Sequence, residues 1–138
     1  MNQDRLAYAS FSIHSDTLDP AFWTAYFGGA PDWSMIKGQH FVTPSGRLSS
    51  VPARVGGWGV GSEHAVQSDA LEPHLRYLII RLGLPRVGFR ELLNQQEARM
   101  RFFCYWDNYS GDRVPEVPDD IRIMIESMGG TIEIDEYR

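Results

Sequence analysis

Cysteine is nearly absent from this chain. Cys104 is the single cysteine among 138 residues, so neither an intramolecular disulfide nor a multi-thiolate zinc site can form. It lies in an aromatic-rich run, and free cysteine is among the residue types most often buried. A reactive thiolate needs a nearby positive charge, but the alternation of the run turns Arg99 and Arg101 to the other side. We therefore expect Cys104 to be structural.

The chain also lacks a net positive charge, long apolar runs and an N-terminal segment that resembles a signal peptide. The formal net charge is −5, whereas a protein that binds DNA or RNA needs a basic surface to neutralise phosphates. No run approaches the roughly 20 apolar residues of a membrane span. The first residues, MNQDR, lack the apolar core of a signal peptide. The sequence therefore predicts a cytoplasmic protein without nucleic-acid or membrane partners.

Recognisable catalytic and cofactor motifs are absent as well. None of the four histidines has a second histidine four residues away, so we predict no metal site and no cofactor. The glycine-rich segment 56–61 lacks the Lys-Ser/Thr pair of a phosphate-binding loop, and no helix follows it directly. It is typical of a strand with a bulge or a close backbone approach. No nucleophile, base and orienting group can be assembled by spacing, so no catalytic residue is assigned.

Four segments are predicted to be strands, namely residues 6–14, 57–63, 98–106 and 131–137. Alternating apolar and polar positions are typical of strands that are buried on one face only. A slip by one residue would exchange the two faces. The side chains expected beneath helices are those of Ala9, Phe11, Ile13, Met100, Phe102, Cys104, Ile132 and Ile134.

The first helix is predicted from its end signals. Asp19 before Pro20 is the order of an N-cap followed by a first helical position, and Gly28 can end the helix in a left-handed conformation. The segment 30–57 that follows is rich in Pro, Gly and Ser, and we expect one or two short strands in it. An unstructured loop of that length would be unusual, so part of this segment is expected to be folded or functional.

Three further helices are predicted after that segment. The apolar spacing of residues 71–82 indicates a helix that Ser68 or Asp69 caps. Pro85 is expected to open a shorter helix, and residues 118–128 carry the last one. Together the elements predict a single α+β domain over residues 1–138. Its sheet is expected to be antiparallel or mixed, with four to five strands, helices packed on one face and a ferredoxin-like general shape.

The sheet face without helices is the candidate binding surface. Arg and Tyr are enriched at interfaces, and here they are mixed with acidic side chains. In the alternative, structural interpretation, the arginines pair with those acidic side chains across neighbouring strands, which contributes about 0.2–1 kcal/mol per pair. The candidate binding residues are Tyr8, His14, Arg99, Arg101, Tyr105, Glu133, Asp135 and Tyr137.

Short motifs along almost the whole chain resemble the bacterial domain-of-unknown-function family four-two-seven-nine. The resemblance implies a small α+β bacterial protein without an established activity, and it assigns no catalytic residues. Proteins of this size class often occur near toxin systems as immunity proteins. The matching motifs are Leu18-Asp19-Pro20, Phe27-Gly28, Ala30-Pro31, Lys37-Gly38, Gly57-Trp58 with Ser62, residues 71–82, Cys104-Tyr105-Trp106 and Asp135-Glu136-Tyr137.

Three classes of function follow from these observations. The first is a non-enzymatic protein-interaction module, such as an immunity or accessory protein, that binds an unknown protein partner through the open sheet face or residues 39–56. The second is a small-ligand sensor that holds an anion against Arg99, Arg101 and Tyr105, and an enzyme is the least favoured class. Aromatic side chains on an open face also favour a two-fold homodimer, in which the arginines pair with acidic residues of the second copy.

Overall fold

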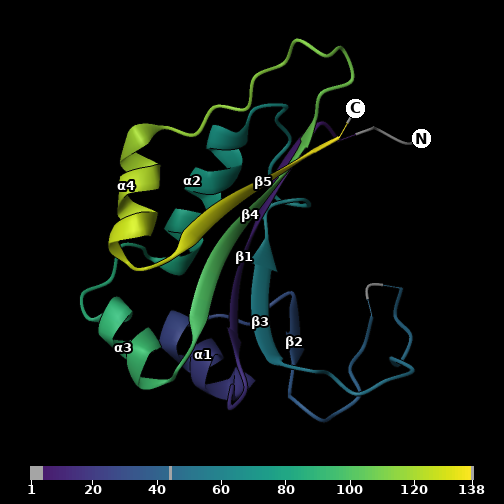
Figure 1. The fold of residues 1–138 in the computed structure, drawn as a ribbon, viewed down its shortest axis with the longest axis vertical. Helices are drawn as coiled ribbons and strands as arrows, with labels where there is room; N and C mark the ends of the chain where they lie inside the picture. Colours follow the sequence, from purple (N-terminus) through teal and green to yellow (C-terminus); the bar gives the residue numbers. More distant parts are fainter. Residues whose placement is uncertain (1–4, 44, 138) are drawn as a thin grey trace.

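A five-stranded sheet with the strand order β2-β3-β1-β4-β5 organises the chain (Figure 1). The structure is a computed structural model that describes residues 5–43 and 45–137. In chain order the elements are β1 (Ala7–Ser15), α1 (Pro20–Phe27), β2 (Trp33–Met35), β3 (Gly56–Gly61), α2 (Leu71–Leu82), α3 (Phe89–Gln95), β4 (Arg99–Asp107), α4 (Asp119–Ser127) and β5 (Thr131–Tyr137).

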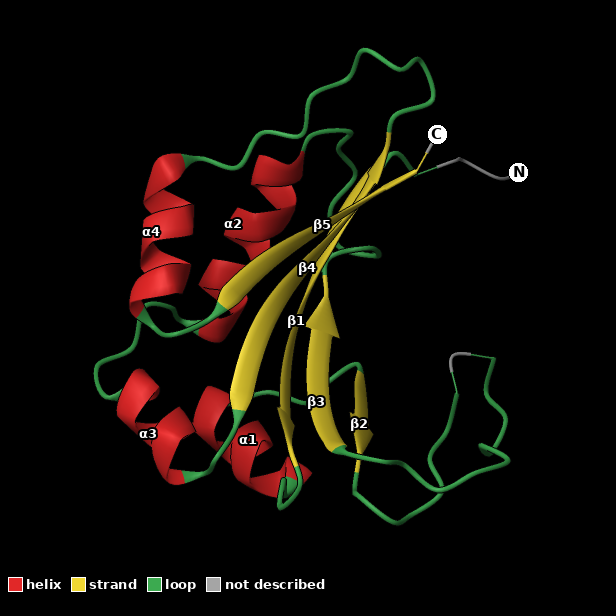
Figure 2. Cartoon of the chain, in the orientation of Figure 1, coloured by secondary structure: helices red, strands yellow, loops and turns green. Residues whose placement is uncertain are grey.

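The sheet is mixed, and its helices lie on one side. β4 and β5 are parallel and α4 connects them, whereas all other neighbouring strands are antiparallel. Figure 2 shows the helices of the described residues on one side of the sheet, with the opposite face uncovered. The predicted α+β class is therefore confirmed. The β-α-β-β-α-β order of ferredoxin-like folds is extended here by a second helix before β4 and by α4 and β5 after it, and the ferredoxin-like general shape is not confirmed.

The pairing of β1 with β4 decides which side chains face the helices. Phe11 lies opposite Phe102, and Tyr8 lies opposite Tyr105. Both phenylalanines are fully buried, whereas both tyrosines are only partly buried. The predicted face assignment is confirmed, because the side chains expected beneath helices are buried. Two of them, Ile132 and Ile134 on the edge strand β5, are partly buried against the core.

Aromatic rings fill the space between the sheet and α1. Phe27 stacks on Trp58 with ring centroids 5.1 Å apart and meets Phe11 edge-on at 5.6 Å. The Trp58 Nε1–H donates to Thr24 Oγ1 at 3.1 Å, so the polar atom of this buried indole has a partner. Aromatic pairs of this kind contribute about 0.5–1.5 kcal/mol each beyond the area that they bury. These contacts fix α1 on the sheet.

The end signals of α1 and the glycine after α2 are confirmed. The Asp19 carboxylate accepts the Ala21 N–H at 3.1 Å, and Gly28 ends α1 with a φ of 74°. Gly83 ends α2 in the same left-handed region, with a φ of 65°. A residue with a Cβ would be strained at both glycines, which is why the sequence signal was informative there.

Two predicted helix starts are wrong. The N-cap of α2 is Ala70, and Ser68 instead accepts the Ala70 N–H at 3.1 Å in the turn before the helix, so neither Ser68 nor Asp69 is the cap. α3 begins at Phe89 and not at Pro85. In both cases a turn directly precedes the helix. Turns use the same Ser, Asp and Pro residues as helix starts, so local signals do not separate the two.

The segment between β2 and β3 is folded back on itself. The Ser49 N–H donates to the Phe41 carbonyl at 2.7 Å, and the Phe41 N–H donates to Ser49 Oγ at 3.0 Å. An isolated antiparallel bridge joins Val42 and Leu48 within it. This bridge and β2 confirm the predicted short strands. Residues 36–43 and 45–55 extend beyond the β2 edge of the sheet (Figure 2).

The two faces of β4 can be compared with adjacent phenylalanines. We expect Phe102→Ala to lower the free energy of unfolding by about 3–5 kcal/mol, because it opens a cavity in the core. Phe103→Ala should cost only about 1 kcal/mol, since Phe103 is partly buried on the uncovered face. Urea unfolding followed by circular dichroism measures both values. Equal losses in the two variants would contradict the face assignment.

Candidate functional site

Three tyrosines form a continuous stack at one end of the uncovered face. The rings of Tyr8 and Tyr105 are parallel within 9° and 4.8 Å apart, and Tyr105 lies 5.0 Å from Tyr137. Burial, followed by the charge of Glu63, raises the pKa of Tyr8. The hydrogen bond that Tyr137 donates to Asp135 raises the pKa of Tyr137. Both phenols are therefore neutral hydrogen-bond donors at physiological pH.

The predicted charged residues lie on β4 and β5 of the same face, and among them Asp135 lies next to this stack. Arg101 Nη1 donates to Glu133 Oε2 at 3.0 Å, so the expected ion pair between β4 and β5 is present for this pair. Asp135 accepts from Tyr137 at 2.5 Å. Arg99 forms no hydrogen bond or ion pair with any residue that the structure describes. The structural interpretation therefore holds for Arg101 and Glu133, and the binding role of the predicted set stays a prediction.

The opposite end of the uncovered face holds His14. Its Nε2 lies 3.2 Å from Ser12 Oγ, while its Nδ1 has no hydrogen-bond partner among residues 5–43 and 45–137. Burial, followed by the charge of Arg101, lowers the pKa of His14, against the opposing effect of the Gly56 backbone near the ring. Because this backbone contact lacks hydrogen-bond geometry, we take the ring to be neutral and partly unsatisfied.

A pocket of about 700 Å³ surrounds this end of the face. Arg99 and Arg101 contribute its positive charges, and three carboxylates offset them. Arg101 Nε is buried there and has no partner among the described residues. The lining residues are His14, Ser15, Asp16, Thr17, Glu97, Arg99, Arg101, Thr131 and Glu133.

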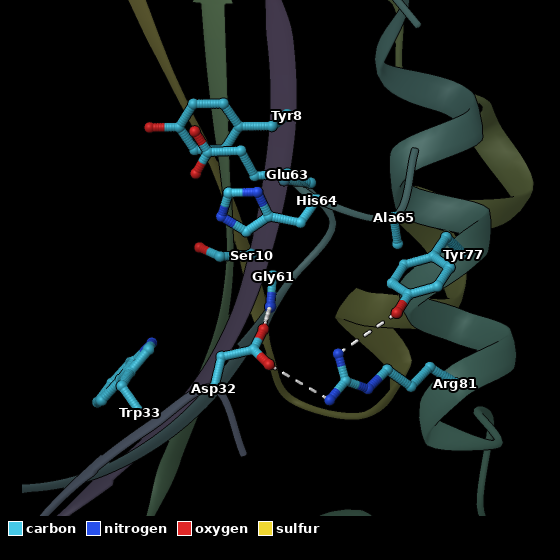
Figure 3. A pocket seen from close by; sticks show the side chains of 11 residues that line it. Tyr8, Ser10, Asp32, Trp33, Gly61, Glu63, His64, Ala65, Tyr77 and Arg81 are labelled. Carbon is cyan, nitrogen blue, oxygen red and sulfur yellow. Dashed lines mark hydrogen bonds and ion pairs between the residues drawn. The ribbon is translucent and has the colours of Figure 1, made fainter. Parts of the chain in front are cut away.

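A second pocket, of about 600 Å³, lies near the tyrosine stack at the edge of β3 (Figure 3). The position of its lining residue Trp33 depends on glycines, since a Cβ at Gly57 would lie 2.7 Å from the indole, and one at Gly59 would also overlap that ring. Trp33 therefore crosses β3 where side chains are absent. The lining residues are Tyr8, Ala9, Ser10, Asp32, Trp33, Gly61, Glu63, His64, Ala65, Tyr77 and Arg81.

Some polar groups of this second pocket have hydrogen-bond or ion-pair partners, and others do not. Asp32 accepts the Gly61 N–H at 2.7 Å and pairs with Arg81 at 3.5 Å, so its charge is compensated. The side chains of Ser10, Glu63 and His64 form no hydrogen bond or ion pair with any described residue. Figure 3 shows the Glu63 and His64 side chains beside Tyr8 and Ser10, at the opposite end of the pocket from Arg81. The pocket thus has free polar groups and one uncompensated carboxylate.

Sequence reasoning did not find this second pocket. Only Tyr8 belongs to the predicted binding set, whereas Trp33, Glu63 and His64 do not. The available signal was the alternation of Gly57, Gly59 and Gly61 on one face of β3. It indicates a close approach to that face but not which side chain makes it.

A serine and a histidine also meet beneath the sheet. Ser62 and His74 are both fully buried, and Ser62 Oγ lies 2.7 Å from His74 Nδ1. Ser62 Oγ accepts the Ala9 N–H at 2.9 Å, and His74 Nε2 donates to the Ser68 carbonyl at 2.8 Å. A neutral ring that donates through Nε2 accepts at Nδ1, so the Ser62 hydroxyl donates to it. The pair joins β1, the end of β3 and α2, and its hydroxyl is not exposed.

Cys104 lies in the core, as the sequence predicted. It is fully buried, and burial raises the pKa of its thiol to about 12. Within residues 5–43 and 45–137, no cluster of three His, Cys, Asp or Glu side chains is arranged to hold a metal ion. None of the helices in this part of the chain has both the length and the apolar character that crossing a bilayer requires.

Comparison with known proteins identifies the family. The family model described as Domain of unknown function (DUF4279) matches residues 5–138, so the chain belongs to this family. No curated protein and no solved structure matches the chain.

Stability should depend on pH through two imidazoles, the buried ring of His74 and the partly buried ring of His14. Burial lowers the pKa of His74 and of His14 below the usual value of 6.5. The folded state then binds fewer protons than the unfolded state, so its stability is complete above pH 6.5 and is lost as the pH falls. We expect urea unfolding at about pH 5 to give a lower free energy than at about pH 7.5.

Replacement of each histidine separates their contributions. His74→Asn should cost about 1–3 kcal/mol at neutral pH by leaving a buried polar group unsatisfied, and it should flatten the pH dependence. His14→Asn should remove the remaining part of the pH dependence, and the double variant should remove the whole of it. A wild-type stability that is constant over this range contradicts the account, as does an undiminished slope in the double variant.

Proposed function

We propose that this member of the DUF4279 family is a non-enzymatic protein-binding module that uses the uncovered face of its sheet. The tyrosine stack is the observation that carries the proposal. Aromatic and arginine side chains are enriched among the residues that dominate binding energies, and here Tyr8, Tyr105 and Tyr137 form one surface. The helices contribute the core on the other side, so this face is free to contact a partner.

Charge supports a partner with a basic surface. The chain carries a formal charge of −5. Around the tyrosine stack lie the carboxylates of Glu63, Asp107 and Asp135. Complementary charge raises association rates and suppresses wrong partners, so a basic protein fits this end of the face best. An immunity or accessory protein that covers a basic protein is a role of this kind.

The segment between β2 and β3 offers a further contact area. Three of its aliphatic side chains are more than half exposed, at 66%, 69% and 60%. The described part of the segment that carries them extends beyond the sheet edge, away from the helices (Figure 2). Exposed apolar groups that gather in one segment are typical of interaction sites. These residues are Val42, Leu48 and Val51.

A small anion against the arginines is the alternative function, and the geometry favours it less. Arg99 and Tyr105 are six residues apart on β4, which is about 20 Å along an extended strand. One small anion therefore cannot contact both. Arg101 is already paired with Glu133, and Glu97 lines the same pocket. A carboxylate or phosphate would meet like charges there.

Matched tyrosine variants test the binding face. The wild-type protein is used to capture its partner from native cells, and the purified partner is then titrated by isothermal calorimetry. We expect Tyr105→Ala to weaken binding about 30-fold, as for a central interface residue. Tyr109→Ala should have no effect, since Tyr109 is an exposed tyrosine in the loop after β4. Thermal melts check that both variants are folded, and equal affinities would refute the proposal.

The oligomeric state tests a second copy as the occupant of the same face. Sedimentation equilibrium at high concentration should give a mass near 15.7 kDa if the face binds another protein. A mass of twice that value would identify a homodimer instead. In that case Arg101→Glu should dissociate it, and the role as a receptor for a different protein would be withdrawn.

A further inference from the structure

We infer that the pocket beside Tyr8 receives an arginine or lysine side chain of the protein partner, with the Glu63 carboxylate as its counter-charge. This inference rests on the proposed function and deepens it by naming the chemistry of one contact. The pocket adjoins the tyrosine stack because Tyr8 belongs to both. A partner that covers the stack therefore also covers the mouth of the pocket.

Aromatic rings make the walls of the pocket suitable for a cation. Tyr8, Trp33 and Tyr77 line it from three different elements or their ends. Aromatic rings attract ammonium and guanidinium groups, and Trp does so most strongly. The long apolar stem of Lys or Arg can lie along such rings while its charged end reaches a carboxylate. Gly57 and Gly59 leave the space on β3 that the Trp33 ring occupies, so this wall is present without a partner.

The charges of the pocket select the sign of the ligand. Asp32 and Arg81 compensate each other at 3.5 Å. Glu63 forms no ion pair with any described residue, so it supplies the uncompensated charge of the pocket. Its effect on a neighbour is visible, because its charge contributes to the raised pKa of Tyr8. A cation entering between these residues would be paired, whereas an anion would face Glu63 directly.

The space available exceeds one side chain. At about 600 Å³ the pocket is of the size that holds small ligands. The partner's backbone next to the cation therefore also finds room, and Ser10 and His64 are free to hydrogen-bond with it. Because Arg forms planar paired hydrogen bonds that Lys cannot form, we expect arginine to bind more tightly than lysine.

Titration with amino-acid amides tests the pocket without the partner. N-acetyl-arginine amide is added to the ¹⁵N-labelled protein, and the indole N–H signal of Trp33 is followed by NMR. We expect a saturable shift with arginine, a weaker one with N-acetyl-lysine amide, and none with the neutral isostere N-acetyl-citrulline amide. Glu63→Gln should weaken arginine binding about two- to fivefold. Glu126→Gln, an exposed change on α4, should leave it unchanged.

Several outcomes would overturn the inference. They are an absent shift, an equal shift with citrulline, a shift with N-acetyl-glutamate amide alone, and unchanged arginine binding in Glu63→Gln. A comparison with the purified partner separates this inference from the proposed function. If Tyr105→Ala weakens partner binding and Glu63→Gln does not, the face binds the partner but the pocket does not hold its cation. If arginine binds but Tyr105→Ala leaves partner binding intact, the pocket serves a free cationic molecule, and the assignment to a protein side chain fails.

Discussion

The antiparallel pairing of β1 with β4 is the constraint on which the rest of the structure depends. It places Phe11 against Phe102 beneath the helices and Tyr8 against Tyr105 on the uncovered face. Side chains alternate with a period of two, so a slip by one residue would move the phenylalanines to the uncovered face and the tyrosines into the core. The core and the candidate binding surface are therefore two consequences of one set of backbone hydrogen bonds.

Glycine in β3 makes the neighbouring region of the sheet unusual. Glycine weakens a strand interior because it has no side chain to pack and more backbone freedom to lose. Here the missing side chains of Gly57 and Gly59 are replaced by the indole of Trp33, which reaches across from β2. β3 therefore has no side chains of its own on this face. The Trp33 ring from the sheet edge covers it and forms a wall of the pocket. Trp58 and Val60, which alternate with these glycines, fill the core side of β3. The glycines therefore cost no core contacts.

Polar groups divide into those that hold the fold and those left free. Ser62 and His74 use all their strong hydrogen-bonding atoms inside the protein, and Asp32 with Arg81 ties the start of β2 to α2. By contrast, Arg99, Glu63 and His64 have no hydrogen bond or ion pair among the described residues, and all three lie on or beside the uncovered face. Exposed polar groups add little to stability, so under the proposed function these three side chains are available to contact a partner.

The sequence by itself determined the features that depend on neighbouring residues. Strand alternation gave the two faces of β1 and β4, and Asp19, Gly28 and Gly83 gave helix ends, because each reflects the local backbone conformation. The open-face residues followed from the same alternation. Local signals failed at Ser68 and Pro85, where a turn uses the residues that also start helices. Only the tertiary structure decided that Trp33 lies over Gly59, that Asp32 and not Glu63 is neutralised by Arg81, and that Ser62 meets His74. Those contacts join elements distant in the chain, and neither a periodicity nor a capping pattern specifies which side chains fill the space between them.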